Sequence, residues 1–168
     1  MMRDKINAFL ALGSNEGDRL ANIDAAESAV ASASGIYLDR SSPTYESPAA
    51  EPCEGQPDFL NRVLAIEIWL TPRELLTTCL DIENKLGRDR GKEGDPHVID
   101  VDILLFGDLI LDEADLKIPH EALARRPFFL KPLADLTGDI ILPGYGVSIN
   151  SLLAGLAPYE LTLFEKKY

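Results

Sequence analysis

Cysteines are scarce in this sequence, and long apolar runs are absent. Only two cysteines, Cys53 and Cys79, occur among 168 residues, and they do not form a Cys-x-x-Cys motif. This count excludes a disulfide-rich scaffold and argues against a structural zinc site. We therefore expect two reduced thiols, with Cys79 packed on a helix and Cys53 in a loop. No apolar run approaches the roughly 20 residues of a transmembrane helix, so no membrane association is expected.

Positive charge is also scarce. The chain has 16 Lys and Arg residues against 28 Asp and Glu residues, a net charge of -12. An acidic surface repels nucleic acid and anionic lipid at long range, so neither is an expected partner. A local arginine cluster can still attract a small anion, because the field of distant charges is screened over about 10 Å. We expect small-molecule partners, and a monomer or weak dimer.

The start of the chain is typical of a first strand. Its short apolar run ends in Gly13-Ser14-Asn15 and not at a small-residue cleavage site, which argues against a signal peptide and favours a cytoplasmic protein. A length of 168 residues suits one compact domain, so residues 1–168 are expected to form a single domain.

The predicted elements follow the order strand, helix, strand, strand, helix, strand. Apolar runs predict strands at 6–12, 36–45, 59–70 and 98–106, and helical spacing predicts helices over about 19–34 and 71–86. This order predicts an α+β fold, a ferredoxin-like βαββαβ antiparallel sheet with helices on one face and a C-terminal extension. The extension contains a short helical stretch after residue 120, the segment 128–136 and a final helix near 149–155.

Local signals support several of these boundaries. Asp18 is a candidate N-cap of the first helix, and Thr71-Pro72-Arg73-Glu74 has the cap, proline and acidic residue of a capping box. Gly107-Asp108 predicts a hairpin turn into a strand at 109–111.

The strongest chemical signal is the segment Ile99-Asp100-Val101-Asp102-Ile103. Side chains alternate along a strand, so Asp100 and Asp102 share one face and the apolar residues share the other, which can be buried. Two such close charges weaken a strand unless cations lie between them, and Mg²⁺ takes one or two carboxylates plus substrate phosphates. The alternative is a pair of solvent-facing aspartates, but the apolar remainder of the strand favours a metal site.

Basic residues cluster around this strand in the sequence. They are Arg88, Arg90, Lys92, Arg125 and Arg126. Guanidinium groups match phosphate oxygens, so the arginines are candidate phosphate ligands. The alternative, cations that complement a helix dipole, explains Arg88 but not the whole group.

Aromatic residues next to an amide form a third signal. Phe59 and Asn61 lie two apart at a strand start and face one side, which suits a flat heterocycle with hydrogen-bonding groups. Phe128 is a candidate for the opposing ring, although core packing of two phenylalanines is the alternative. His120 is more often structural than catalytic as a lone histidine, but near phosphate its protonated form could donate to an oxygen.

Together these segments resemble the 6-hydroxymethyl-7,8-dihydropterin pyrophosphokinases of the folate pathway. The similar segments occur in the family's order and cover nearly the whole chain, although none is decisive alone. They are ALGSN (11–15), YESP (45–48), QPDFLN (56–61), LGRDR (86–90), DVDIL (100–104), IPH (118–120) and RPFFL (126–130).

The resemblance implies transfer of diphosphate from ATP to the hydroxymethyl group of a reduced pterin, with release of AMP. Asp100 and Asp102 would hold two Mg²⁺ ions that bridge the ATP phosphates. Phe59 and Phe128 would sandwich the pterin, and Asn61 would read its polar edge.

The same resemblance implies further contacts. The backbone around Ser47 and Pro48 would also touch the pterin. The residues implied to bind ATP are Arg88, Arg90, His97, His120 and Arg126, and the first two would join the aspartates in catalysis. The loops at about 47–58 and 88–97 would close over the ligands and exclude water.

The sequence departs from the family pattern at 94–97, which reads Gly94-Asp95-Pro96-His97 where the family usually has Gly-Pro-Arg. His97 is shorter than arginine and mostly neutral at pH 7, and Asp95 adds negative charge. We predict weaker ATP retention or slower transfer than an arginine version would show, without loss of activity.

Two other functions are compatible with parts of the pattern. A nucleotidyltransferase also pairs Gly-Ser with Asp-x-Asp, but there the Gly-Ser lies shortly before the carboxylates, whereas Gly13-Ser14 lies far from Asp100. A non-catalytic ferredoxin-like binding or regulatory module is the other alternative. Such a module has no need for two aspartates on one face with arginines alongside.

Overall fold

The computed structural model describes residues 3–50, 53–87 and 97–165. Within them the strands are β1 (Ile6–Ser14), β2 (Ile36–Ser41), β3 (Tyr45–Ser47), β4 (Phe59–Ile68), β5 (Asp100–Phe106), β6 (Leu111–Glu113), β7 (Leu116–Ile118) and β8 (Thr162–Leu163). The helices are α1 (Arg19–Ser32), α2 (Pro72–Lys85), α3 (Pro127–Thr137) and α4 (Ile149–Leu156), with a short 3₁₀ turn at Leu123–Arg125.

An antiparallel sheet forms the centre of the molecule, so the α+β prediction is confirmed. Its strands run in the order β5-β1-β4-β3-β8, and β2 also pairs with β4. The register places Gly13 of β1 opposite Asn61 of β4 on one side and opposite Asp100 of β5 on the other. Ala11 lies opposite Asp102 in the same way. Three strands therefore bring the predicted site residues into adjacent positions.

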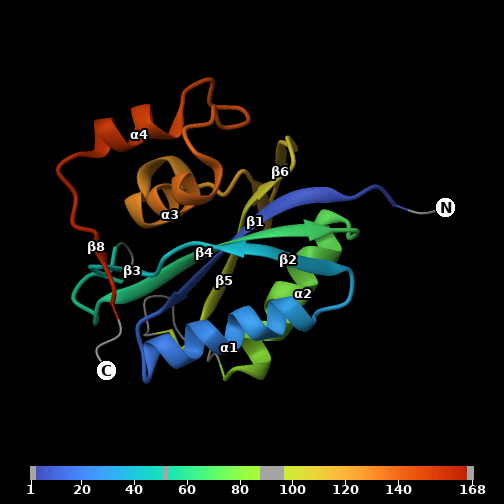
Figure 1. Cartoon of the computed structure of the whole chain (residues 1–168), viewed down its shortest axis with the longest axis horizontal. Helices are drawn as coiled ribbons and strands as arrows, with labels where there is room; N and C mark the ends of the chain where they lie inside the picture. The colour runs from blue at the N-terminus through green and yellow to red at the C-terminus, as the bar shows by residue number, and fades with distance from the viewer. Residues whose placement is uncertain (1–2, 51–52, 88–96, 166–168) are drawn as a thin grey trace.

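One face of the sheet packs against α1 and α2 (Figure 1). Alternate residues of the strands point to this face, including Leu10 and Leu12 of β1 and Val101 and Ile103 of β5, and all are buried. The expectation that the apolar partners of the two aspartates are buried is thereby confirmed.

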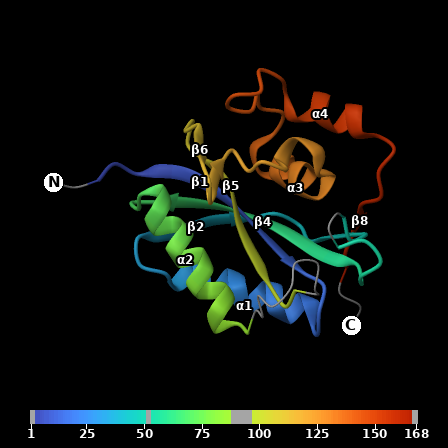
Figure 2. The same ribbon diagram turned by 180° about the vertical axis from the view of Figure 1, so that it is seen from behind.

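The opposite face packs against α3, with α4 outside it, as Figures 1 and 2 show. Its core includes Ala11, Val63 and Leu105 from the sheet and Phe129 and Leu133 from α3. The two helices of the predicted βαββαβ unit, α1 and α2, do share one face, and α3, which lies in the predicted C-terminal extension, covers the other. The apolar residues on this second strand face need cover from water, and the C-terminal part of the chain provides it.

The helix starts follow the predicted capping signals. Asp18 accepts a hydrogen bond of 3.1 Å from the Ala21 N–H at the start of α1. At the start of α2, Thr71 accepts from the Glu74 N–H at 3.2 Å and the Glu74 carboxylate accepts from the Thr71 N–H at 3.2 Å. These bonds satisfy N–H groups that have no partner inside the helix.

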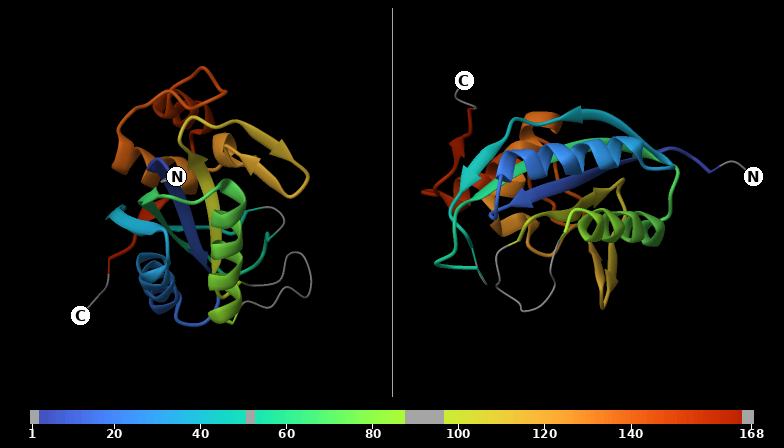
Figure 3. Two further views of the ribbon diagram at one scale, coloured as in Figure 1. Left: turned by 90° about the vertical axis from the view of Figure 1, so that its right-hand side faces the viewer. Right: turned by 90° about the horizontal axis from the view of Figure 1, so that it is seen from below.

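Two predicted strands are placed differently. The run 36–45 is divided into β2 and β3, because Pro43 lacks an N–H group for the ladder and the chain turns there. Gly107-Asp108 is a turn, but the chain then leaves the sheet, and β6 pairs with β7 instead of returning to β5. This small hairpin projects from the body of the molecule in both views of Figure 3.

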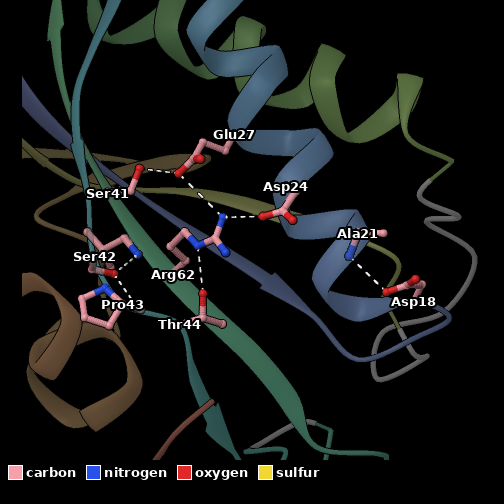
Figure 4. Close-up of polar contacts among 10 residues, drawn as sticks. Asp18, Ala21, Asp24, Glu27, Ser41, Ser42, Pro43, Thr44 and Arg62 are labelled. Carbon is pink, nitrogen blue, oxygen red and sulfur yellow. Dashed lines mark hydrogen bonds and ion pairs between the residues drawn. The ribbon is translucent and has the colours of Figure 1, made fainter. Parts of the chain in front are cut away.

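A polar cluster secures α1 to the sheet (Figure 4). Arg62 of β4 donates to Asp24 of α1 at 2.8 Å and to Thr44 at 2.9 Å, and Glu27 lies 3.7 Å away. The Arg62 side chain is 12% exposed, so these partners stabilise a largely buried charge.

Both cysteines are buried thiols, as expected, Cys79 on α2 and Cys53 in the loop before β4. Among the helices of the described segments, none has the length and apolar character that a membrane crossing requires.

Candidate active site

A cavity of about 110 Å³ lies where β1, β4 and β5 meet the start of α3. We call it the aromatic cavity. It is lined by Ala11, Gly13, Ala50, Cys53, Phe59, Asn61, His97, Asp100, Asp102, Arg126, Phe128 and Phe129. The structure thus brings together the two aspartates, the two phenylalanines and the asparagine that the sequence identified separately.

Asp100 and Asp102 project from the α3 face of β5, as the strand alternation predicts. Their side chains are 19% and 38% exposed, so both can be reached by a ligand. The His97 Nδ1 atom lies 2.8 Å from the Asp100 Oδ2 atom. His97 therefore holds one carboxylate of the pair from the side of the aromatic cavity.

A second cavity, of about 290 Å³, adjoins the first along the open edge of β5. We call it the polar cavity. Its lining consists of Leu76, Leu80, Glu83, Val101, Asp102, Ile103, Ala114, Asp115, Leu116, Lys117, His120 and Glu121. Asp102 lines both cavities, so this carboxylate stands on their common border.

The pKa and the hydrogen bond of His120 favour its neutral form over the protonated donor that the sequence left as an alternative. Burial, together with the nearby Arg126 charge, lowers the pKa of His120 to about 4. Its Nδ1 atom accepts a hydrogen bond of 3.0 Å from the Ala122 N–H, which leaves the proton on Nε2. The Nε2 atom lies 3.9 Å from the Asp102 Oδ1 atom. Neutral His120 can therefore still donate an N–H toward the border between the cavities.

Arg126 supplies positive charge inside the aromatic cavity. Its guanidinium carbon lies 5.5 Å from the centre of the Phe128 ring and 5.4 Å from that of Phe129, within the range of cation–π attraction. Burial lowers the pKa of Arg126, and the charges of Asp102 and Asp100 oppose that effect. An arginine remains charged at neutral pH after such a shift, so the group can bind a phosphate.

A hydrogen bond to Ser47 orients the amide of Asn61. Its Nδ2 group donates to the Ser47 Oγ atom at 2.8 Å, and Ser47 itself is buried outside the cavity lining. Pro48 is exposed and does not line the cavity. The loop that follows β3 instead reaches the cavity through Ala50 and Cys53.

Sequence reasoning missed several lining residues. Ala11, Gly13, Ala50, Cys53 and Phe129 carry no chemical signal of their own, and only the strand register or the loop path places them here. For Ala11 and Gly13, the alternation of β1 combined with its pairing to β5 was the available signal.

Glu83 is a buried carboxylate that the sequence did not single out. It lies on α2, is 2% exposed, and its Oε2 atom accepts a hydrogen bond of 2.7 Å from the Val101 N–H. Because Val101 lies between Asp100 and Asp102, this bond fixes the strand that presents the pair. Glu83 lies near the end of a helix that contains both polar and apolar residues, and its place in the sequence gave no indication of this role.

The predicted phosphate ligands Arg88 and Arg90, and the nearby Lys92, lie outside the described residues. Across the described ranges, no group of three or more His, Cys, Asp or Glu side chains is arranged to hold a metal ion. The pair of carboxylates nevertheless fits Mg²⁺, which prefers hard oxygen ligands and often takes only one or two from the protein and the rest from phosphates and water.

Comparison with known proteins gives one consistent result. The family model described as 7,8-dihydro-6-hydroxymethylpterin-pyrophosphokinase (HPPK) matches residues 9–138. A 2-amino-4-hydroxy-6-hydroxymethyldihydropteridine pyrophosphokinase of Synechocystis sp. is 39% identical over 146 residues, covering 87% of this chain and 74% of the relative. A protein of the same name from Pseudomonas aeruginosa is 40% identical over 152 residues, covering 90% of this chain and 92% of its own.

Solved structures show the same fold. A Plasmodium falciparum HPPK-DHPS wild-type structure with pteroate matches 92% of this chain with a TM-score of 0.70, at 16% sequence identity. This chain covers 43% of that longer protein. The match to the family model and the identity to full-length relatives agree with the geometry, and the chain belongs to the HPPK family.

Proposed function

We propose that this chain transfers a diphosphate group from ATP to the hydroxymethyl group of 6-hydroxymethyl-7,8-dihydropterin, a step of folate biosynthesis. The observation that carries the proposal is the position of Asp102. One carboxylate lines an aromatic cavity on one side and a polar cavity on the other. A reaction between a flat heterocycle and a nucleotide needs such a border.

The aromatic cavity is assigned to the pterin. Phe59 and Phe128 supply ring faces, and the Asn61 carboxamide supplies hydrogen bonds to the polar edge of the heterocycle. Ser47 supports the pterin through Asn61, and the backbone near Pro48 is a further predicted contact.

The polar cavity is assigned to the nucleoside part of ATP, with the phosphates directed toward Asp102. Val101 and Ile103 of the edge strand β5 line it. Glu83 already binds the Val101 N–H, so other backbone groups of this edge are the ones we propose to contact a base. Four of its twelve lining residues are acidic and one is a lysine, so the phosphates need cations beside them.

Asp100 and Asp102 are the residues that would hold Mg²⁺, and we propose two ions, as the family resemblance implies. Mg²⁺ held there would neutralise phosphate charge and favour ionisation of the attacking hydroxyl. Arg126, His97 and the neutral Nε2–H of His120 are the groups we propose to contact phosphate oxygens. Arg88 and Arg90 remain predicted phosphate ligands and catalytic residues.

The chemistry is an in-line displacement. The pterin hydroxyl oxygen forms a bond to the β-phosphorus, the bond from that phosphorus to the oxygen of the α-phosphate breaks, and AMP leaves while the hydroxyl proton is released. Such a transfer depends on positioning and charge stabilisation more than on covalent help from the protein. The residues around Asp102 supply both.

The direct test is a product assay. The protein is mixed with Mg²⁺, ATP and the reduced hydroxymethylpterin, and nucleotides are separated by chromatography. We expect AMP and the pterin diphosphate in equal amounts. Release of pyrophosphate would instead identify a nucleotidyltransferase, and ligand binding without turnover would identify a binding module.

We infer that β1-α1-β2/β3-β4-α2-β5 is a ferredoxin-like unit, because its strand order β5-β1-β4 with β2 and β3 beyond follows that arrangement. A single domain over 1–168, a monomer or weak dimer, a cytoplasmic location and the lack of a nucleic-acid partner stay predictions.

A further inference from the structure

Asn15 is a buried polar residue beside the site that lines neither cavity. It follows β1 in the turn before α1 and is 2% exposed. Its side chain makes hydrogen bonds to two segments that are far apart in the sequence, one before β4 and one before β5. Asn15 therefore connects two parts of the site.

The donor end of the side chain holds the entry to β4. The Asn15 Nδ2 group donates to the Gln56 Oε1 atom at 3.0 Å and to the Pro57 carbonyl at 3.2 Å. Phe59, the first residue of β4, follows two residues later and lines the aromatic cavity. The position of this ring therefore depends on the segment that Asn15 holds.

The acceptor end of the same side chain holds His97. The Asn15 Oδ1 atom accepts from the His97 N–H at 2.7 Å, and the Asn15 N–H donates to the His97 carbonyl at 3.1 Å. His97 in turn contacts Asp100 through Nδ1, and its ring meets the edge of Phe59 with centroids 6.3 Å apart.

A single planar amide thus links two groups that line the aromatic cavity, the Phe59 ring assigned to the pterin and, through His97, the Asp100 carboxylate. Asp100 is also a proposed ligand of the Mg²⁺ that accompanies the nucleotide. Its donor and acceptor cannot move independently, and hydrogen bonds at a buried position are not readily replaced by water. We propose that Asn15 is a positioning residue that couples the two sites, so that occupation of one strengthens binding at the other. The inference rests on the proposed function, because it needs a pterin and a nucleotide as the two ligands.

Titration calorimetry with two ligands tests this coupling. The dissociation constant of the reduced hydroxymethylpterin is measured with and without saturating Mg²⁺ and α,β-methylene-ATP, in which the reacting bond is blocked. The ratio of the two constants is the coupling factor. We expect at least about 5-fold for the parent chain, the lower end of typical coupling, and within about 2-fold of unity for Asn15→Ala.

Asn22→Ala is the matched control. Asn22 is another amide of the same turn region, and its Nδ2 group donates to Ser14 at 3.2 Å and to the Glu16 carbonyl at 2.8 Å, without touching the entry to β4 or His97. We expect this variant to keep the parent's coupling factor. Gln56→Ala is a milder second variant, which removes one acceptor and leaves the Pro57 bond, so its coupling factor should fall between the other two.

The possible results distinguish a failure of the coupling inference from a failure of the proposed function. If both binary affinities weaken in Asn15→Ala while the coupling factor stays at the parent value, Asn15 has only a local structural role and the inference is wrong. A parent chain that binds both ligands with a factor near unity also overturns the inference and leaves the proposed function intact. A parent chain that binds neither ligand overturns both. Thermal unfolding of each variant shows whether the turn still folds, and Gln56→Ala decides the matter if Asn15→Ala does not.

Discussion

On the face of the sheet that α1 and α2 cover, β1 presents Ala8, Leu10 and Leu12, all of them buried in one apolar core. On the α3 face the same strand presents Phe9, Ala11 and Gly13, so its side chains become smaller toward the site. A strand therefore builds a core with one set of residues and leaves room for ligands with the residues between them. Stability and chemistry should accordingly respond to different substitutions.

Asp102→Ala should break this comparison most strongly. It removes the carboxylate that lines both cavities, and we expect AMP release to fall by roughly 10³-fold, on the scale of losing a main electrostatic group of a transition state. The thermal midpoint should stay or rise, because a like-charge neighbour of Asp100 is lost. Asp39→Ala, at an exposed aspartate of β2 beside Arg40, is the control that should change neither quantity. Unchanged turnover in Asp102→Ala would favour a binding module.

Leu64→Ala tests the other face. Leu64 is fully buried in the α1 and α2 core, so truncation should lower the free energy of unfolding by about 2–5 kcal/mol. Turnover per folded molecule should be kept, which a denaturation curve and an activity assay at the same temperature can show. Leu163→Ala, at a leucine that is 56% exposed, should have a much smaller effect. A loss of turnover in fully folded Leu64→Ala would show that the two faces are not separable.

Glu83 joins α2 to the strand that presents the two aspartates, so its substitution should affect both stability and ligand binding. Glu83→Leu leaves the Val101 N–H without its acceptor and should cost about 1–3 kcal/mol of unfolding free energy, with weaker nucleotide binding. Glu83→Gln keeps an acceptor oxygen and should recover most of both. Equal losses in the two variants would mean that the negative charge, and not the hydrogen bond, is what the strand needs.

His120, which packs against Phe129 of α3, should make the stability of the folded chain depend on pH. Its pKa is lowered to about 4 in the folded chain, mainly by burial, from about 6.5 when unfolded. The unfolded state therefore binds more protons between these values, and the contribution of His120 to stability is present above about pH 6.5 and declines as the pH falls toward 4. Unfolding curves at several pH values should show a smaller decline in His120→Gln. Identical slopes for the two proteins would contradict a neutral, buried His120.

The smallest effect is expected from His97→Arg, which refines the site without disturbing either core. An added guanidinium near Asp100 should strengthen ATP binding or speed transfer by a few-fold, because its charge persists at neutral pH. Steady-state kinetics with varied ATP can measure both. If kcat and ATP affinity both fall, the Asp100 contact that His97 now makes is more valuable than the missing charge.

Much of the fold could be predicted from the sequence because its signals are local. The capping box at Thr71 and the alternation around Asp100 each depend on a few neighbouring residues, and both were confirmed. The packing of α3 on the second face was not predicted. It depends on which strand faces remain uncovered once α1 and α2 are in place, and this is a property of the whole sheet.

The candidate site could be predicted in part for the same reason. Asp100, Phe59 and Asn61 carry chemical signals, and the structure brings them into one cavity. Glu83 and Asn15 were missed, because their importance comes from a hydrogen bond to a residue distant in sequence. The neutral state of His120 was also missed, since only its burial and the Ala122 contact determine it.

Gly13 occupies the middle of the row formed with Asn61 and Asp100, and its φ angle is not positive. Its lack of a side chain is therefore not required by the backbone. A methyl group there would lie 3.6 Å from the Phe59 ring and 3.7 Å from the Asn61 oxygen, on the floor of the cavity. Gly13 carries a hydrogen where every other residue carries a Cβ atom, and the depth available to a bound heterocycle depends on this difference. A larger residue at position 13 would restrict the size of the substrate without remodelling the strand.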